Sequence, residues 1–139
     1  EVIDNYQCTM QAVVFELLNN EDDPAQGIRD VFEVTLFCLP EDAMALGCLL
    51  VNTVNELSPI DIELSNLASA KLALVEQAFI NACARAQAQN QMSKAVSADD
   101  AGKMLMNTMI GLRVQSRGGA SEAHLRQSIT PLLTMLMSS

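Results

Sequence analysis

Apolar residues recur three or four positions apart along most of the chain, which is the spacing of one face of an α-helix. The pattern predicts an all-α fold of about six helices. The first four cover roughly 2–19, 24–39, 43–57 and 61–92, and the last two begin after Ser97 and after Ser121.

The expected helix starts rest on capping residues. Asp23 followed by Pro24, with Gln26 three positions after Asp23, combines an N-cap, a proline at the first helical position and a capping-box partner. Ser97 and Ser121 are typical N-cap residues as well. We therefore expect helices to begin directly after each of these three caps.

The expected helix ends follow from proline and glycine. The second helix should stop before Pro40, because a residue that precedes proline disfavours helical geometry. Gly118 and Gly119 should form a left-handed cap after the fifth helix. Pro131 should kink the sixth helix, because it removes one backbone hydrogen bond.

The third and fourth helices differ in character. Residues 46–54 are apolar nearly all round, which is typical of a buried short helix, so we place this helix at the centre of the domain. The fourth helix is the longest and would span roughly 45 Å. Its small residues indicate either close packing or a tapering exposed end; they are Ala82, Ala84, Ala86 and Ala88.

Composition agrees with this fold class and restricts the function. Half of the 139 residues are hydrophobic but only 4% are aromatic, and a chain of this length is expected to form one domain over 1–139. The net charge is −9, and the basic residues are scattered between Arg29 and Arg126. Phosphate contacts need clustered basic residues, so we expect neither nucleic acid nor an anionic membrane as a partner of this segment.

The cysteines favour a reducing compartment. Cys8, Cys38, Cys48 and Cys83 lie far apart without C-x-x-C spacing, which predicts free thiols in helices and a cytoplasmic location. No uncharged run reaches the length of a membrane span, and no signal peptide opens the chain. Because the first residue is Glu1 rather than Met, we expect a fragment or a processed product.

Catalytic chemistry has no visible basis in the sequence. The one histidine, His124, lacks a second histidine and an E-x-x-H spacing, so a surface or interface position is expected. No glycine-rich loop joins a strand to a helix. We therefore expect no catalytic residues, no metal and no cofactor.

Polar side chains on the apolar third helix leave two interpretations open. Asn52, Thr53 and Asn55 are either ordinary hydrogen-bonded core residues or the orienting groups of a small-molecule cavity. Methionines on the fifth helix suit an adaptable pocket, but they also fill ordinary cores. We predict a cavity for an apolar ligand between the second, third, fourth and fifth helices, lined by Phe32, Leu36, Leu50, Thr53, Phe79 and Met109.

Several segments, in the same order, resemble TetR-type transcriptional regulators. The sixth helix of that family is similar to residues 47–57, GCLLVNTVNEL, and the long helix after it is similar to residues 76–86, EQAFINACARA. Residues 101–121 resemble the final helix pair. The similarity covers about 46–137, whereas residues 1–39 have no distinctive motif.

This resemblance implies a helical effector-binding domain that dimerises through a four-helix bundle, made by the last two helices of each protomer. It also implies a three-helix DNA-binding unit ahead of the domain. Nothing in this chain supplies that unit, so DNA binding would belong to an intact parent protein.

The apolar stripe of the sixth helix favours the same interface on physical grounds. The stripe is wide for the end of a small domain, so one side is expected to cover the fifth helix and the other to contact a second copy. The alternative is that the whole stripe belongs to the core of one protomer. The predicted interface comprises Leu112, Leu125, Ile129, Leu132, Leu133 and Leu136.

The sequence thus predicts the effector-sensing domain of a TetR-like repressor, with a small apolar molecule and a second copy of the chain as its partners. Two other functions stay open. One is a helical dimerisation module without a ligand, and the other is a helical-bundle cofactor enzyme, whose metal or cofactor ligands the sequence lacks.

Overall fold

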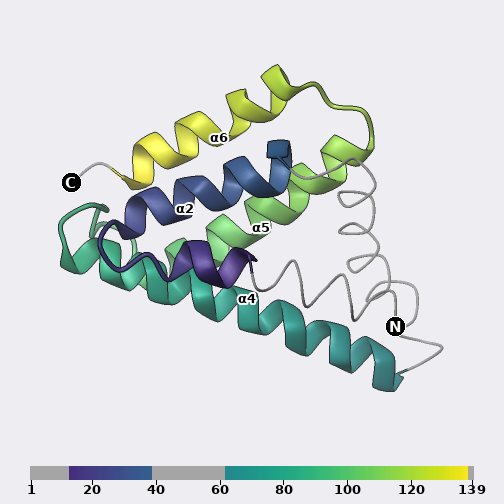
Figure 1. Cartoon of the computed structure of the whole chain (residues 1–139), viewed down its shortest axis with the longest axis horizontal. Helices are drawn as coiled ribbons and strands as arrows, with labels where there is room; N and C mark the ends of the chain where they lie inside the picture. The colour runs from purple at the N-terminus through teal and green to yellow at the C-terminus, as the bar shows by residue number, and fades with distance from the viewer. Residues whose placement is uncertain (1–12, 39–61, 138–139) are drawn as a thin grey trace.

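The structure is a computed structural model that describes residues 13–38 and 62–137 (Figure 1). Within these two ranges every regular element is helical and no strand occurs, so the all-α prediction is confirmed for the described part. Residues 13–18 are helical. The elements after them are α2 (Pro24–Glu33), η1 (Val34–Cys38), α4 (Ile62–Ala88), α5 (Ala98–Arg117) and α6 (Glu122–Leu136).

Two further findings concern the predicted third helix and the possibility of a membrane-spanning helix. The predicted third helix, over 43–57, lies outside the described residues. Across 13–38 and 62–137, no helix combines the length and the apolar character that crossing a membrane would require.

Three helices begin at the predicted caps. The side-chain oxygens of Asp23, Ser97 and Ser121 each accept a hydrogen bond, 3.1 Å long, from the backbone N–H three residues later. Each bond satisfies an N–H group that has no partner within the first helical turn. These starts depend on neighbouring residues alone, which is why the sequence predicts them well.

The capping box predicted at the start of α2 is only half formed. The Gln26 side chain does not return to the backbone of Asp23; it donates to Asp30 Oδ1 at 2.9 Å, one turn further along the helix. The backbone N–H of Asp23 bonds instead to Asn20 Oδ1 at 3.1 Å. The Asn20 side chain, in the turn before α2, therefore accepts the hydrogen bond from the Asp23 N–H that the sequence pattern assigned to Gln26.

A π-helical turn, η1, continues α2 without a break. Its Thr35 side chain is fully buried, and the hydroxyl donates to the carbonyl oxygen of Val31 at 2.6 Å. A hydroxyl bonded to a carbonyl in the preceding turn competes with the helical backbone pattern. Such a single π-helical turn is not visible in apolar spacing, and the sequence did not predict it.

α4 ends at Ala88, before the predicted end at Met92. Asn90 adopts a left-handed backbone conformation, with φ of 59°. The N–H of Gln91 then bonds back to the carbonyl of Ala86 at 2.8 Å. This pattern is a Schellman cap, in which asparagine takes the place more often held by glycine.

The turn between α5 and α6 has the predicted left-handed glycine. Gly119 has φ of 98°, and the N–H of Ala120 bonds to the carbonyl of Gln115 at 3.0 Å. α6 then continues through Pro131 to Leu136. The tight turn sends α6 back alongside α2 (Figure 1).

α4 and α5 cross at very short range. A Cβ atom added at Gly102 of α5 would lie 2.7 Å from both the Cα and the backbone nitrogen of Ile80 on α4. Ala82 and Ala86 of α4 are fully buried, whereas Ala84 and Ala88 are exposed. Two of the four small residues of α4 therefore lie on its packed face, and the other two lie on its exposed face.

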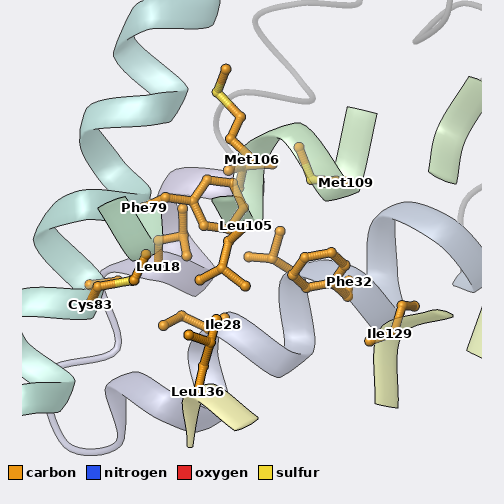
Figure 2. Close-up of a cluster of buried hydrophobic side chains, with 14 of the residues drawn as sticks. Leu18, Ile28, Phe32, Phe79, Cys83, Leu105, Met106, Met109, Ile129 and Leu136 are labelled. Atoms are coloured by element: carbon orange, nitrogen blue, oxygen red, sulfur yellow. The ribbon is translucent and has the colours of Figure 1, made fainter. Parts of the chain in front are cut away.

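One apolar core joins the described helices. Figure 2 shows Phe79 of α4 and Leu105 of α5 pointing toward α2, with Leu136 of α6 beside Ile28 of α2. All of these side chains are at most 3% exposed. Each helix buries one face in this shared cluster, which also includes Leu18 from the first helical segment.

Candidate functional site

Four of the six residues predicted to line the cavity lie in this core. Phe32, Leu36, Phe79 and Met109 are each at most 4% exposed and belong to the same buried cluster. The rings of Phe32 and Phe79 are 6.4 Å apart between centroids and inclined by 56°, a favourable aromatic arrangement. The structure thus brings together residues from α2, η1, α4 and α5.

The other two residues, Leu50 and Thr53, lie outside the described residues. Because they were expected to supply the third-helix wall and a polar group, the predicted cavity stays a prediction. Thr35 is the buried polar residue of the described core, and its hydroxyl already donates to a backbone carbonyl.

A groove runs between α2 and α6, and the sequence did not predict it. Its volume is about 290 Å³, and its floor is formed by Phe32, Ile129 and Leu133. Phe32 and Ile129 are buried and Leu133 is half-buried. Arg29 and Thr130 stand on the two sides of the groove, both on exposed positions.

One end of the groove is closed by an ion cluster centred on Arg126. Its guanidinium donates two hydrogen bonds to the Glu33 carboxylate, at 2.8 and 2.9 Å, and a third to Glu122 at 2.8 Å. The same group lies over the Phe37 ring, 4.0 Å from the centroid. All three guanidinium nitrogens are engaged, so this end of the groove has no spare cation.

The ion cluster shifts the pKa values of its members. The hydrogen bonds and charge of Arg126 lower the pKa of Glu33 below its ordinary value, against a smaller opposing effect of burial. The bonds from Glu33 and Glu122 raise the pKa of Arg126 further above its usual range. Both partners stay charged at neutral pH and neutralise each other.

The predicted dimer residues divide into two groups. Leu112, Leu125, Ile129 and Leu136 are buried inside the protomer, where they pack in the shared core. Leu132 and Leu133 are half-buried and pack against that core. Much of the stripe therefore covers α2 and α5 within one protomer, and the interface with a second copy stays a prediction.

Other apolar side chains on the same two helices are more exposed. Met104 and Val114 of α5 are 41% and 50% exposed, and Met135 of α6 is 71% exposed. The interface predicted from apolar spacing did not include them. Met104 and Met135 lie in uncharged stretches of the chain, since neither 104–112 nor 127–137 contains a charged residue.

His124 lies on the surface, as predicted. Its Nε2 atom is 3.2 Å from Gln115 Oε1, so the two side chains join α5 to α6 beside the connecting turn. In the ranges that the structure describes, no three His, Cys, Asp or Glu side chains gather as a metal site would require. The arrangement gives His124 a structural contact between helices.

Cys83 is the buried free thiol of the described part. It is fully enclosed in the core, and burial raises the pKa of the thiol to about 12. The thiolate is the nucleophilic form of cysteine, so this side chain is unreactive at neutral pH.

Comparisons with protein-family models, with curated proteins and with solved structures give no match to the chain.

Proposed function

We propose that the chain is the effector-binding and dimerising domain of a TetR-like transcriptional regulator. The ordered resemblance of residues 47–57, 76–86 and 101–121 to that family supports the proposal, as does the helical architecture. The observation on which it rests most directly is the pair of uncharged stretches, 104–112 of α5 and 127–137 of α6, on the two helices that the resemblance assigns to the dimer.

Several exposed, uncharged positions of α5 follow one stripe. Met104, Asn107, Gly111 and Val114 are spaced by three or four residues along α5, and all four are exposed. A Cβ atom added at Gly111 would meet nothing within 4 Å among the residues that the structure describes, so packing within 13–38 and 62–137 does not require glycine there. A second copy approaching closely over Gly111 would explain its small size.

α6 has a matching stripe. Exposed Ser128, half-buried Leu132 and exposed Met135 follow the same spacing, whereas the two charged residues of the helix, Glu122 and Arg126, bond to each other. An exposed apolar surface on a small domain usually marks a partner. A two-fold axis would let the stripes of α5 and α6 pair with their own copies, which makes a homodimer the simplest occupant.

Dimerisation is tested by Met135→Glu, with Leu74→Glu as the matched control. The side chains of Met135 and Leu74 are both exposed, by 71% and 56%. Leu74 lies on α4, away from the proposed interface. We expect sedimentation velocity to show a dimer for the parent chain and for Leu74→Glu. Met135→Glu should dimerise about a hundredfold more weakly, because the axis introduces the charge twice.

Two results would contradict this part of the proposal. One is a parent chain that is monomeric at micromolar concentration. The other is an equal effect of the two glutamate variants, which would place the interface elsewhere or reduce the effect to general charge repulsion. Circular dichroism of each variant checks that the helices remain folded.

The effector is proposed to bind beside the buried cluster of Phe32, Leu36, Phe79 and Met109. These side chains supply an apolar surface, and they come from four elements, α2, η1, α4 and α5, as a pocket between helices requires. A thermal-shift screen of hydrophobic and cationic small molecules tests this, because a ligand that binds only the folded chain raises its unfolding midpoint. A dimer that no compound stabilises would favour a dimerisation module without a ligand.

A further inference from the structure

The apolar and the polar side chains of the groove between α2 and α6 occupy different parts of it. α2 and α6 run in opposite directions there, since Glu33 pairs with Arg126 at one end while Ile28 lies beside Leu136 toward the other (Figure 2). The floor between these points is apolar. The groove therefore offers an apolar surface with polar groups confined to its sides and its closed end.

Arg29 is the cation left over at this groove. Arg126 is occupied by Glu33 and Glu122, as its three hydrogen bonds show. Arg29, one turn before Glu33 on the same helix, makes no hydrogen bond or ion pair among the residues that the structure describes.

The acidic groups beside Arg29 on α2 are already engaged. Glu33 accepts the two bonds from Arg126, and Asp30 accepts a bond from the Gln26 amide at 2.9 Å. The hydroxyl of Thr130, across the groove from α2, also has no partner among the described residues. A free guanidinium and a free hydroxyl thus stand over one apolar floor.

We propose that this groove binds a small amphipathic monoanion, with its carboxylate at Arg29 and its hydrocarbon part on Phe32, Ile129 and Leu133. A guanidinium matches a carboxylate with two parallel hydrogen bonds, and the hydroxyl supplies a further donor. The volume of about 290 Å³ lies at the small end of ligand pockets, which suits a medium-chain carboxylate such as octanoate. A dianion is less well matched, because the second charge would have no free cation.

This site does not depend on the proposed dimer, although its floor shares Phe32 with the cluster proposed for the effector. On α6 the stripe proposed for the dimer contains Ser128, Leu132 and Met135, whereas the groove is lined by Arg126, Ile129, Thr130, Leu133 and Thr134. The two sets lie on different faces of one helix. A monomer and a dimer would both present the groove, so failure of the dimer leaves this site standing.

The test is a titration of the chain with octanoate, followed by amide chemical shifts in NMR, with 1-octanol as the uncharged counterpart. We expect octanoate to bind with an apparent Kd of about 1 mM and to shift the amides around Arg29 and Leu133. Arg29→Gln should weaken octanoate binding about threefold to fivefold. Lys103→Gln removes the same charge from an exposed position on α5 and should leave the Kd unchanged.

A second variant tests the location by filling the groove. Thr130→Phe places a large side chain at an exposed position on the groove wall, and it should abolish octanoate binding with little effect on the unfolding midpoint. The proposal is overturned if octanoate does not bind, if octanol binds equally well, or if Arg29→Gln and Lys103→Gln behave alike. Binding that survives Thr130→Phe overturns it as well, because the ligand would then lie elsewhere, including the cavity proposed for the effector.

Discussion

α4 and α5 meet through small side chains at very short range, whereas α2 and α6 meet across a groove with a charged bridge at one end. At the first contact, Gly102 lies against the backbone of Ile80. At the second, Arg126 and Glu33 join two helices whose side chains leave about 290 Å³ between them. Close contact excludes any occupant and makes the helix pair rigid, while the bridged contact keeps the helices together and leaves room for a ligand.

The two contacts also differ in how sensitive they are to sequence. Packing at the density of a protein interior has no room for an added methyl group, and an error there must move a whole helix. An exposed ion pair tolerates change, since water replaces the lost partner. We therefore expect stability to depend on the α4–α5 contact and binding to depend on the α2–α6 contact.

The largest effect is expected at Gly102. Gly102→Ala places a Cβ atom 2.7 Å from the backbone of Ile80, so α4 and α5 must move apart. We expect the free energy of unfolding to fall by about 3 kcal/mol, measured by urea denaturation followed by circular dichroism. Gly118→Ala is the matched control, because the added Cβ atom would lie at an ordinary 3.4 Å from the carbonyl of Gln115.

The control should be neutral or slightly stabilising, since alanine restricts the unfolded chain more than glycine does. Equal stability of the Gly102→Ala variant and the parent chain would show that the two helices are not held at this distance. The comparison between a close contact and a bridged one would then lose its physical basis.

A second, smaller effect concerns Cys83, on the buried face of α4. Burial raises the pKa of its thiol to about 12, whereas an unfolded cysteine titrates near 8.5. Between these values the unfolded chain loses the proton and the folded chain keeps it, so stability is full below pH 8.5 and falls as pH rises. We expect a loss of about 2 kcal/mol between pH 8 and pH 10.

Denaturation of the parent chain and of Cys83→Ala at both pH values isolates this contribution. The alanine variant should be less stable at pH 8 but should lose less stability at pH 10. Mass spectrometry after alkylation at pH 8 gives a second measurement, in which the peptide with Cys83 reacts only when the chain unfolds. Rapid alkylation of native Cys83 would mean that the thiol is accessible and that α4 does not enclose it.

The small residues of α4 left two interpretations open, close packing or a tapering exposed end, and the structure buries Ala82 and Ala86 while it exposes Ala84 and Ala88. The sequence did not single out Gly102, which makes the close contact with α4. The helix starts at Asp23, Ser97 and Ser121 were predictable, because an N-cap is formed by residues three positions apart.

The features that the sequence did not predict depend on residues far apart in the chain or on local backbone geometry. Glu33 and Arg126 are 93 positions apart, so their pairing and the groove beside it follow from the fold and not from any local pattern. The left-handed Asn90 and the π-helical η1 are backbone geometries that apolar spacing does not reveal. Spacing did identify Phe32, Leu36, Phe79 and Met109 as residues that meet, and their burial together agrees with this.

The smallest effect is expected at the bridge between Glu33 and Arg126. Both side chains are more than 40% exposed, so water and salt screen the pair. Glu33→Gln should lower the unfolding midpoint by about 2 °C at neutral pH and low salt, measured by differential scanning calorimetry. Because Arg126 lowers the pKa of Glu33 in the folded chain, this contribution is present above the ordinary pKa of glutamate. It is lost as pH falls through the lowered value, and the parent and variant midpoints should then converge.

A double-mutant cycle with Arg126→Gln separates the pair from its surroundings. Arg126 also bonds to Glu122 and stacks on Phe37, so its single variant should lower the midpoint more than Glu33→Gln does. The coupling between the two substitutions should shrink in 1 M salt, whereas the Gly102→Ala effect should not, because steric contact is not screened. If the coupling energy does not change with salt, the α2–α6 bridge is held by packing, as the α4–α5 contact is. The contrast between the two contacts would then disappear.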